Sequence, residues 1–545
     1  MTKKIPYGIA SFEEIRENDY IFIDKTSYVR DLENYKVPVF LRPRRFGKSL
    51  WCSLLECYYD INRKDKFDFL FGELDIGRNP TLNKNKYLVM RFDLSKVAVK
   101  NDLNFIERTF SSISQDSINS FIAMYKKDYL KDFFYKETLS PSEVLSKVLS
   151  YIKDNNLPPV YLIIDEYDNF TNQLITTHQD GLYYELTTGD SFFRSWFKVI
   201  KAGVGERTID RIFITGVLPI TIDDLTSGFN ITEIITLEEN TLSMLGFTQE
   251  EVDKYIMEVY ENYKLDKANM EEIKKILQEN FNGYKFLPNA DTPLYNSTIL
   301  TYFLKKLALS GGKIPREIID ENLRTDLNWI KRLTQKEENA KEMLETLLLE
   351  KELPYDSKMI TSKFNMNQFF EKDFYSLSLF YLGMLTFKNN FKMQFPNLTI
   401  KQIFTEYFNA IENIEVSKGY TDIFERFVED LDIEALFQGY WDVYVKQLPA
   451  QIFDKVNENF YRTTFYELCT RYLSHVFTFA IENNYPSGRV DWEMLGKFHT
   501  KYKHQKYLIE FKYFSNAEGG KLKLLRLKKS KEKDIEQIRL YEKDI

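Results

Sequence analysis

Cysteine and histidine are scarce in this chain. Three cysteines and four histidines occur among 545 residues. Cysteines as few and as scattered as Cys52, Cys57 and Cys469 exclude a disulfide framework and a cysteine-based zinc site. The shortage of histidine also argues against histidine-rich metal sites. Carboxylates and lysines must therefore carry any chemistry, and we expect a reducing, cytoplasmic location.

Long apolar runs and an excess of positive charge are also absent. No uncharged apolar run reaches the ~18 residues of a membrane-spanning helix, and residues 1–19 lack the apolar segment of a secretion signal. Lysine and arginine number 74 against 81 aspartates and glutamates, a net charge of −7. Such a chain has no global basic field that would attract nucleic acid. We expect no membrane association, and any nucleic-acid binding must be local.

The chain does have enough apolar material for several packed cores. Hydrophobic residues make up 43% of it and aromatic residues 16%. At roughly 150 residues per domain, the length predicts three or four domains, and we predict a division into residues 1–240, 241–445 and 446–545. Residues 491–545 hold 14 lysines and arginines against 9 acids. This imbalance indicates a small basic final module, although a solvated lysine-rich helix over residues 521–533 is the simpler explanation.

The first domain is predicted to be an α/β core with a parallel sheet. Short apolar segments alternate with helical ones, and their continuous apolar character is typical of strands covered on both faces. The expected strands are residues 37–41, 87–92, 160–164 and 211–215. From residue 243 to about 368 the pattern is helical, which predicts a helical lid and middle region.

A phosphate-binding loop is indicated between the first strand and a helix. Residues 42–49 read Arg-Pro-Arg-Arg-Phe-Gly-Lys-Ser. Gly47 would let backbone amides approach phosphate, Lys48 would reach the β- and γ-oxygens, and Ser49 would ligate Mg²⁺. Arg42 stands where the pattern has its first glycine and cannot reproduce that glycine's positive φ, so the loop must be shaped differently. Taken alone, the segment fits a basic turn equally well.

Two adjacent acids follow the third strand. Asp165 would orient the metal or its waters, and Glu166 would polarise the attacking water. The simpler alternative is a buried strand that reaches solvent at polar residues. Thr215, at the end of the fourth strand, would lie between the two motifs and hold that water, unless it only caps the strand. The residues predicted to bind ATP and its Mg²⁺ are Arg44, Arg45, Phe46, Gly47, Lys48, Ser49, Leu50, Asp165 and Thr215.

Two arginines near the fourth strand suggest self-association. Arg207 and Arg211 are candidates for a charge-stabilising arginine that acts on a neighbouring subunit. Surface arginines usually have no such role. The catalytic interpretation predicts a homo-oligomer.

A second acid and lysine cluster occurs near the end of the chain. Residues 507–512, Tyr-Leu-Ile-Glu-Phe-Lys, predict a strand on which Glu510 and Lys512 share one side while Phe511 packs behind them. Asp491, on a neighbouring strand and followed by a polar insertion, would complete an oxygen-rich Mg²⁺ site with Lys512 beside it. Glu-x-Lys on a strand is, however, a frequent chance pattern.

Together these motifs resemble the AAA-ATPase-like family, whose members typically carry a C-terminal PD-(D/E)XK nuclease-like domain. The similarity rests on residues 23–26, 42–49, 164–168, 214–219, 227–230 and 246–248, with further landmarks at 281–286 and 381–386. The family also has arginine in place of the first loop glycine, which implies that Arg42 is compatible with ATP binding.

The resemblance also implies roles in the C-terminal domain. It makes Asp491, Glu510 and Lys512 metal-binding and catalytic residues, supported by Glu458 and Gln537. Glu467 is an alternative to Glu458 as the helix carboxylate. Members usually continue past the helix around Tyr541 into another strand, so we expect either that this sheet lacks an edge or that the sequence is truncated after Ile545.

The sequence thus predicts an ATP-binding switch whose nucleotide state controls a Mg²⁺-dependent nuclease that acts on nucleic acid, DNA in preference to RNA. The alternative is a nucleotide-dependent interaction protein with a degenerate nuclease-like binding module. The acidic net charge and the absent strand favour the alternative. The intact set of Asp491, Glu510 and Lys512 opposes it.

Overall fold

The computed structural model describes residues 2–136, 138–225, 229–315, 318–319, 327–336, 338–360, 364–453, 455–513 and 532–541. The chain forms two compact units that interleave in sequence. The first unit comprises Met1–Tyr263, Gly283–Leu304 and Pro354–Met393, and the second comprises Lys264–Asn282, Lys305–Leu353 and Gln394–Ile545. The division into residues 1–240, 241–445 and 446–545 stays a prediction. Across the described ranges, no helix has the length and apolar character needed to cross a membrane.

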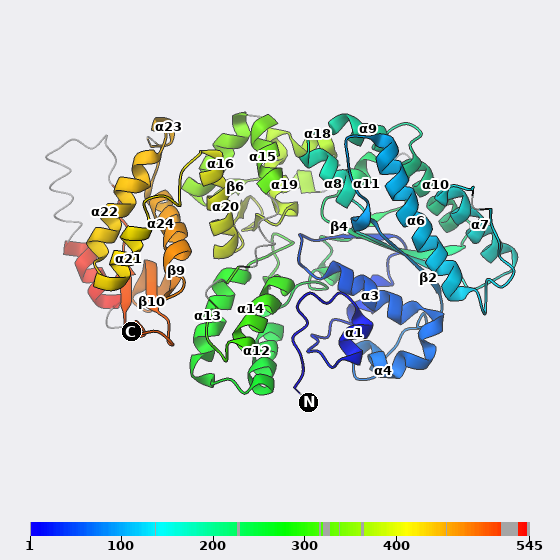
Figure 1. Ribbon diagram of the computed structural model, residues 1–545, viewed down its shortest axis with the longest axis horizontal. Coiled ribbons are helices and arrows are strands. Elements are labelled where there is room, and N and C mark those ends of the chain that lie inside the picture. Colours follow the sequence, from blue (N-terminus) through cyan, green and yellow to red (C-terminus); the bar gives the residue numbers. More distant parts are fainter. Residues whose placement is uncertain are drawn as a thin grey trace. The chain divides into compact units, whose positions relative to one another are not determined.

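A five-stranded parallel sheet lies at the centre of the first unit (Figure 1). Its order is β2-β3-β4-β1-β5, with β1 at Pro38–Leu41, β2 at Leu88–Asp93, β3 at Val160–Asp165, β4 at Ile209–Gly216 and β5 at Glu233–Ile234. The four predicted strands are confirmed, with ends that differ by one or two residues. β3 is buried along its whole length, as expected for a strand covered on both faces. Strand β5 was not predicted, because two residues are too few to produce a pattern.

Helices pack on this sheet and connect its strands. α3 (Lys48–Tyr59) packs on β3, α6 (Leu103–Tyr125) on β2, and α10 (Phe192–Gly205) on β4. The other helices that begin in this unit are α1 (Phe12–Glu17), α2 (Tyr28–Leu32), α4 (Phe67–Phe71), α5 (Asp75–Arg78), α7 (Pro141–Asp154), α8 (Asn169–Thr176), α9 (Asp180–Thr187), α11 (Ile220–Asp224), α12 (Gln249–Tyr263), α14 (Ser297–Leu309), α17 (Ser357–Ile360), α18 (Met366–Phe369) and α19 (Tyr375–Tyr381). The sequential order of strand, loop and helix brings both predicted motifs to the carboxyl edge of the sheet.

The second unit is mainly helical. Its helices are α13 (Met270–Phe281), α15 (Leu327–Lys336), α16 (Glu338–Glu350), α20 (Leu398–Ile411), α21 (Thr421–Asp430), α22 (Ile433–Val443), α23 (Ala450–Phe453) and α24 (Glu458–Leu473). The predicted helical middle region is therefore confirmed. The chain also contains a short sheet of order β6-β8-β7, formed by β6 (Glu352–Pro354), β8 (Lys392–Gln394) and β7 (Thr386–Phe387), which was not predicted.

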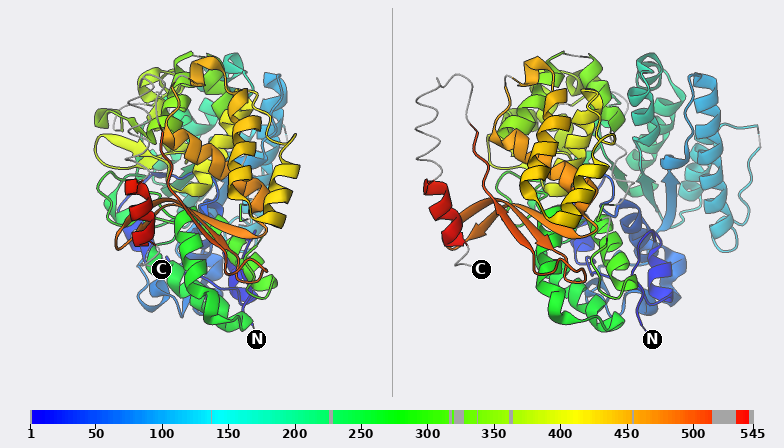
Figure 2. Two further views of the ribbon diagram at one scale, coloured as in Figure 1. Left: turned by 90° about the vertical axis from the view of Figure 1, so that its left-hand side faces the viewer. Right: turned by 60° about the vertical axis from the view of Figure 1, so that its left-hand side comes forward.

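A small antiparallel sheet completes the second unit (Figure 2). Its order is β11-β10-β9, with β9 at Phe477–Tyr485, β10 at Gly488–Gly496 and β11 at Lys506–Ile509. Val490, Trp492 and Met494 are fully buried, so β10 continues for five residues beyond Asp491. The polar insertion expected directly after Asp491 is thus wrong, because an in-and-out alternation extends the strand.

Strand β11 is shorter than the predicted strand at residues 507–512. It ends at Ile509, so Glu510 and Lys512 follow the strand rather than lie within it. The backbone N–H of Phe511 donates to Asp491 Oδ2 at 3.0 Å. This side-chain acceptor takes the N–H that a strand partner would otherwise bind, which explains why the ladder stops.

Some predicted features lie outside the described residues. These are Ser227 and Gly228 of the family motif and most of the lysine-rich stretch at residues 521–533. Residues 532–541 are helical.

Candidate active sites

The loop between β1 and α3 places Gly47 and Lys48 at the start of a buried helix. Gly47 is the N-cap of α3 and has a φ of 90° and a ψ of 19°, in the left-handed region that glycine tolerates. The other positive φ of the loop, 73°, belongs to Arg45. The loop therefore turns at Arg45 and Gly47, and Arg42 needs no glycine-like conformation.

The Arg42 side chain is buried and connects the start of the loop to other segments of the first unit. Its side chain is 1% exposed, and its guanidinium carbon lies 4.2 Å and 3.8 Å from the ring centroids of Phe40 and Phe286. The guanidinium donates to main-chain carbonyls of Leu41, Thr236 and Leu242 at 2.9–3.0 Å. Burial lowers the pKa of Arg42 to about 9. Carbonyl oxygens and ring faces compensate the buried charge, so this arginine fastens the start of the loop to its surroundings.

The Lys48 side chain folds over the loop. Its Nζ lies 3.2 Å from the carbonyl oxygen of Arg42, 3.3 Å from that of Pro43, and 3.5 Å from Glu166 Oε1. Lys48 is 4% exposed. The amine is therefore held between the loop backbone and the acid that follows β3.

Asp165 is buried at the end of β3 and pairs with an arginine of β2. Arg91 Nη2 lies 2.9 Å from Asp165 Oδ2, and Arg91 Nη1 lies 3.4 Å from Glu56 Oε2. Burial raises the pKa of Asp165, while Arg91 and the Ser49 hydroxyl counteract part of that rise. Arg91 was not among the predicted site residues. The pattern that could have indicated it is a charged residue within an otherwise apolar predicted strand.

The Asp165 carboxylate has an oxygen suited to a metal ion. Within the described residues, Asp165 Oδ1 is buried and accepts no hydrogen bond. The Ser49 hydroxyl lies close enough to affect the pKa of this carboxylate. Mg²⁺ is typically held by one or two carboxylates together with water and substrate phosphate. Ser49 and Asp165 therefore fit Mg²⁺ as a pair of oxygen donors.

Glu166 and Thr215 flank the same edge of the sheet. Glu166 has a φ of 54°, and its carboxylate faces Lys48. Strand β4 lies between β3 and β1, which places Thr215 between the two motifs. The Thr215 hydroxyl is buried and donates to the carbonyl of Phe40 at 3.0 Å. It ties β4 to β1, and its role in holding a water molecule stays a prediction.

Asp168 fixes the ends of β3 and β4 relative to each other. Its carboxylate accepts backbone N–H groups of Val217 and Leu218, at 3.1 Å and 2.7 Å from Oδ2. Burial raises the pKa of Asp168 to about 6. A Cβ at Gly216 would lie 2.4 Å from Asp168 Oδ1, so only glycine fits there. The sequence analysis assigned Asp168 no function of its own, although it is the last acid of the Asp-Glu-Tyr-Asp motif.

The other predicted loop residues contact the same unit. The carbonyl of Arg44 accepts Asn296 Nδ2 at 3.2 Å, and that of Arg45 accepts the N–H of Thr298 at 3.1 Å. Phe46 is buried edge-on against the rings of Tyr284 and Phe286, and Leu50 is half-buried in the first turn of α3. The main-chain carbonyls of Arg44 and Arg45 and the ring of Phe46 thus fix the loop within the first unit.

Arg207 and Arg211 lie at the opposite edge of the sheet from the loop. Arg207 is exposed just before β4. Arg211 Nη1 donates to the carbonyls of Glu33 and Tyr35 at 2.7 Å and 3.1 Å. Both arginines therefore lie away from the loop of their own chain, and a catalytic role on a neighbouring subunit stays a prediction.

In the second unit, Asp491 and Glu510 meet where β10 and β11 separate. Glu510 Oε1 accepts the N–H of Asp491 at 3.4 Å, and Lys512 Nζ lies 3.3 Å from Glu510 Oε2. The Phe511 ring packs against the rings of Phe437 and Phe465. The structure thus brings Asp491, Glu510 and Lys512 together, with Phe511 turned into the core.

Burial, and then the charge of Asp491, disfavour ionisation of Glu510 and Glu458. Burial and then the charge of Asp491 raise the pKa of Glu510 to about 7, and Lys512 opposes the rise. The pKa of Glu458, in the first turn of α24, is raised by burial and then by Asp491. Among the described residues, no group of three or more His, Cys, Asp or Glu side chains forms a metal site. Asp491 and Glu510 would supply two carboxylates at most to a metal ion, and a bound Mg²⁺ would then retain several waters.

Arg462 of α24 pairs with Asp491. Arg462 Nη1 lies 2.7 Å from Asp491 Oδ1, and its Nη2 lies 3.0 Å from Glu482 Oε1. Glu482 also pairs with Lys351 and Arg489. Arg462 is 4% exposed. The sequence analysis missed it, and its only local signal was its spacing of four residues from Glu458 on one helix face.

Two supporting residues stand apart from the carboxylate pair. Glu467 pairs with Arg471 further along α24. Gln537 donates to the hydroxyl of Tyr541, which itself donates to the carbonyl of Arg489 at 2.9 Å. Gln537 thus reaches β10 through Tyr541.

Comparisons with known proteins identify two segments. Residues 6–226 match the family model described as a predicted AAA-ATPase, and residues 456–545 match that of the PD-(D/E)XK nuclease superfamily. No curated protein matches the chain. Among solved structures, the chain is similar to the Walker-type ATPase PABY2304 of Pyrococcus abyssi, with 15% identity and a TM-score of 0.40, over 70% of this chain and 96% of that one. The resemblance inferred from the motifs is confirmed for both segments.

Proposed function

Because the chain carries an AAA-ATPase-like domain at residues 6–226 and a PD-(D/E)XK nuclease-like domain at residues 456–545, we propose that it couples two hydrolytic activities. The first unit binds and hydrolyses ATP with Mg²⁺, the second cuts nucleic acid with Mg²⁺, and the nucleotide state controls the cutting. One shared arrangement supports this proposal. At each site a lysine lies within 3.5 Å of a glutamate, beside an aspartate paired with an arginine.

In the ATPase reaction, the residues of the loop bind and orient the triphosphate. The backbone at the start of α3 and the amine of Lys48 bind phosphate oxygens, and Ser49 and Asp165 hold Mg²⁺. The metal supplies charge neutralisation for the phosphates. Glu166, next to Asp165, accepts a proton from the attacking water. Lys48 must leave the carbonyls of Arg42 and Pro43 to reach a phosphate.

In the nuclease reaction, the second unit activates a water against a phosphodiester. Asp491 and Glu510 would hold Mg²⁺, and the metal would supply a water of lowered pKa. Lys512 donates to a phosphate oxygen or orients the water. Glu510 must be ionised to hold the metal, so its raised pKa makes metal binding favour pH values above about 7.

We expect the nucleic acid to be DNA in preference to RNA. The lysine-rich stretch at residues 521–533 contacts the phosphate backbone, which makes binding sensitive to salt.

ATP also promotes self-association in this proposal, so that Arg207 or Arg211 reaches the loop of a neighbouring subunit. Light scattering on Glu166→Gln protein tests this at tens of micromolar. Growth in mass with ATP supports the proposal, and a monomer with and without ATP removes the reason for naming these arginines.

The second candidate function is nucleotide-dependent binding without cleavage. Arg462 and Lys512 already neutralise Asp491 and Glu510, and no larger acidic cluster is present among the described residues. A module with these pairs intact needs no metal to be stable. This observation favours a degenerate nuclease-like domain.

Incubation with labelled single- and double-stranded DNA and RNA separates the two functions. The full chain is assayed with Mg²⁺ or Mn²⁺, with and without ATP, beside Glu510→Ala and the exposed control Glu425→Ala. Cleavage by wild type and Glu425→Ala, but not by Glu510→Ala, supports the nuclease. Retarded but intact nucleic acid supports the binding module.

A further inference from the structure

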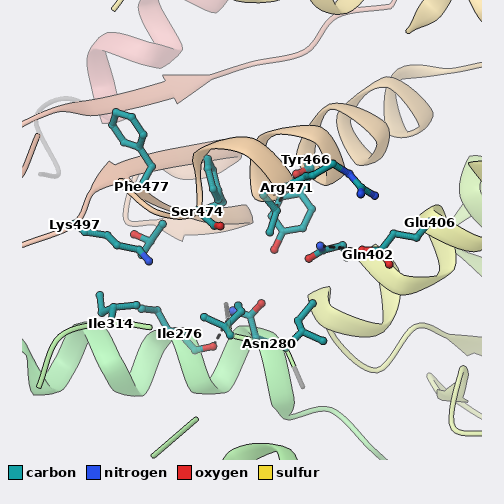
Figure 3. A pocket seen from close by; sticks show the side chains of 15 residues that line it. Ile276, Asn280, Ile314, Gln402, Glu406, Tyr466, Arg471, Ser474, Phe477 and Lys497 are labelled. Carbon is teal, nitrogen blue, oxygen red and sulfur yellow. Dashed lines mark hydrogen bonds between the residues drawn. The ribbon is translucent and has the colours of Figure 1, made fainter. Parts of the chain in front are cut away.

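The second unit contains a cavity of about 270 Å³ that belongs to neither candidate active site (Figure 3). Its walls come from α13, α20, α24 and β9, from Lys497 after β10, and from residues 314, 318 and 319 after α14. Pockets for small molecules usually measure roughly 300–1,000 Å³. The cavity therefore suits a ligand no larger than a mononucleotide.

One end of the cavity carries a buried amine. Lys497 is 2% exposed, and its Nζ donates to the carbonyl of Pro315 at 3.0 Å. Burial lowers the pKa of Lys497 to about 8, and Glu272 opposes the fall. An anionic ligand group at this end would stabilise the charged amine. Figure 3 shows Lys497 beside Phe477, at the end away from Gln402 and Glu406.

The other end presents hydrogen-bond acceptors. Asn280 Nδ2 donates to the carbonyl of Ile276 at 2.9 Å, and Gln402 Nε2 donates to Glu406 Oε1 at 3.3 Å. Both amides are at least nine-tenths buried. Each amide nitrogen keeps one further N–H, and each amide oxygen offers two lone pairs, so acceptors outnumber donors at this end. This end therefore selects a group that carries N–H donors.

The walls between the two ends carry aromatic and branched side chains beside the hydroxyls of Thr470, Ser474 and Thr478. Tyr466 of α24 and Phe477 and Phe479 of β9 line one side, and Ile276 and Ile314 line another. Arg471, which also lines the cavity, is already paired with Glu467. Aromatic and branched side chains of this kind favour a planar heterocycle.

We propose that this cavity binds a nucleoside monophosphate whose base carries an exocyclic amine. The phosphate pairs with Lys497, the amine donates to the oxygens of Gln402 and Asn280, and the base lies against the aromatic wall. A free phosphate or a nucleoside satisfies only one end. The site is separate from the loop that binds ATP, because all its residues belong to the second unit.

Calorimetry on full-length Lys48→Ala protein tests the proposal without interference from the ATP loop. The probes are AMP, CMP, GMP and UMP, with adenosine and inorganic phosphate as partial ligands. We expect AMP, CMP and GMP to bind at least tenfold more tightly than UMP, adenosine or phosphate. Absence of mononucleotide binding at millimolar concentration overturns the proposal.

Two further substitutions in this background test the two ends separately. Lys497→Met should weaken AMP at least tenfold and leave adenosine unchanged, while the exposed control Lys503→Met should change neither. Gln402→Leu should remove the preference for CMP over UMP. Its control is Gln438→Leu, which alters a similar Gln and acid pair on an exposed helix face. Wild-type AMP affinity in Lys497→Met contradicts the assignment.

Hydrogen exchange keeps the test valid if Lys497→Met does not fold. AMP should slow amide exchange in peptides that cover α13 and the start of β9 in Lys48→Ala protein. Protection confined to the loop around residues 42–49, or none at all, overturns the proposal.

Discussion

The two candidate active sites use the same charged groups in very different surroundings. At each, an aspartate pairs with an arginine, Asp165 with Arg91 at 2.9 Å and Asp491 with Arg462 at 2.7 Å. The first aspartate ends a buried strand of a five-stranded sheet. The second lies in the central strand of a three-stranded sheet, next to the point where pairing with β11 stops. Its side chain is 17% exposed against 2% for Asp165. The two sites thus carry similar charged groups, but Asp165 is held in a more buried position than Asp491.

The two acidic sites differ in the feature that would favour a bound cation. In the first unit a buried carboxylate oxygen accepts nothing from the described residues, so the site is arranged for a further ligand. In the second unit, burial and then the charge of Asp491 raise the pKa of Glu510 to about 7, so a bound cation would favour the ionised form of Glu510. Both features favour a metal, by different physical routes.

The largest expected effect is loss of cleavage on removal of the second donor pair. Asp491→Ala or Glu510→Ala removes a metal ligand, and Lys512→Ala removes the adjacent positive charge. Each should lower Mg²⁺-dependent cleavage roughly 10²–10⁴-fold. ATP binding, measured by calorimetry, should stay at the wild-type level in all three. Wild-type cleavage by Glu510→Ala would contradict the catalytic assignment.

At the first site, two substitutions should produce different defects. Lys48→Ala should weaken ATP binding at least roughly 30-fold, because a buried charge partner of the phosphates is lost. Glu166→Gln should retain binding and lower turnover roughly 10²–10⁴-fold. Calorimetry and phosphate release measure the two quantities, with exposed Lys64→Ala as the control. Wild-type affinity in Lys48→Ala would exclude the phosphate-loop assignment.

The two arginines should differ in their contribution to stability. Arg91→Ala leaves Asp165 buried and unpaired, which should destabilise the first unit by roughly 3–5 kcal/mol. Arg462→Ala should cost less, because Asp491 is more exposed. Calorimetric melting compares both with Lys153→Ala, which breaks an exposed ion pair with Glu206. Adding Asp165→Asn to Arg91→Ala should restore part of the lost stability. If Arg91→Ala and Arg462→Ala lowered stability equally, the distinction between the two sites would be removed.

The smallest expected effect is a pH dependence that belongs to Glu510. Its pKa in the folded chain lies above its ordinary value of 4.5, so the native state binds the proton more tightly than the unfolded state does. Stability is therefore lost as pH rises from about 4.5 through 7. Glu510→Gln should melt higher than wild type at pH 8 and not at pH 4.5. Mg²⁺ at pH 8 should raise the melting temperature of wild type but not that of Glu510→Gln. If wild type and Glu510→Gln had the same melting temperature at both pH values, this assignment would be contradicted.

The sequence predicted the parts of both sites that are local in the chain. Residues 42–49 and the acids after β3 form a strand, loop and helix pattern within short segments, so their placement could be inferred. Arg91 and Arg462 could not, because their partners lie 74 and 29 residues away. Similarly, β11 was predicted too long, since the bond from Phe511 N–H to Asp491 that ends it joins residues 20 positions apart.

Control of cleavage by bound nucleotide is the central claim, and one experiment tests it directly. The cleavage rate of labelled duplex DNA is measured with Mg²⁺ and either ATP or ADP, for wild type, Glu166→Gln and Lys48→Ala. The account predicts that the rate with ATP differs from the rate with ADP in wild type, that this difference is largest in Glu166→Gln, which holds ATP without turnover, and that it vanishes in Lys48→Ala. Equal rates with ATP and ADP in Glu166→Gln would contradict the account.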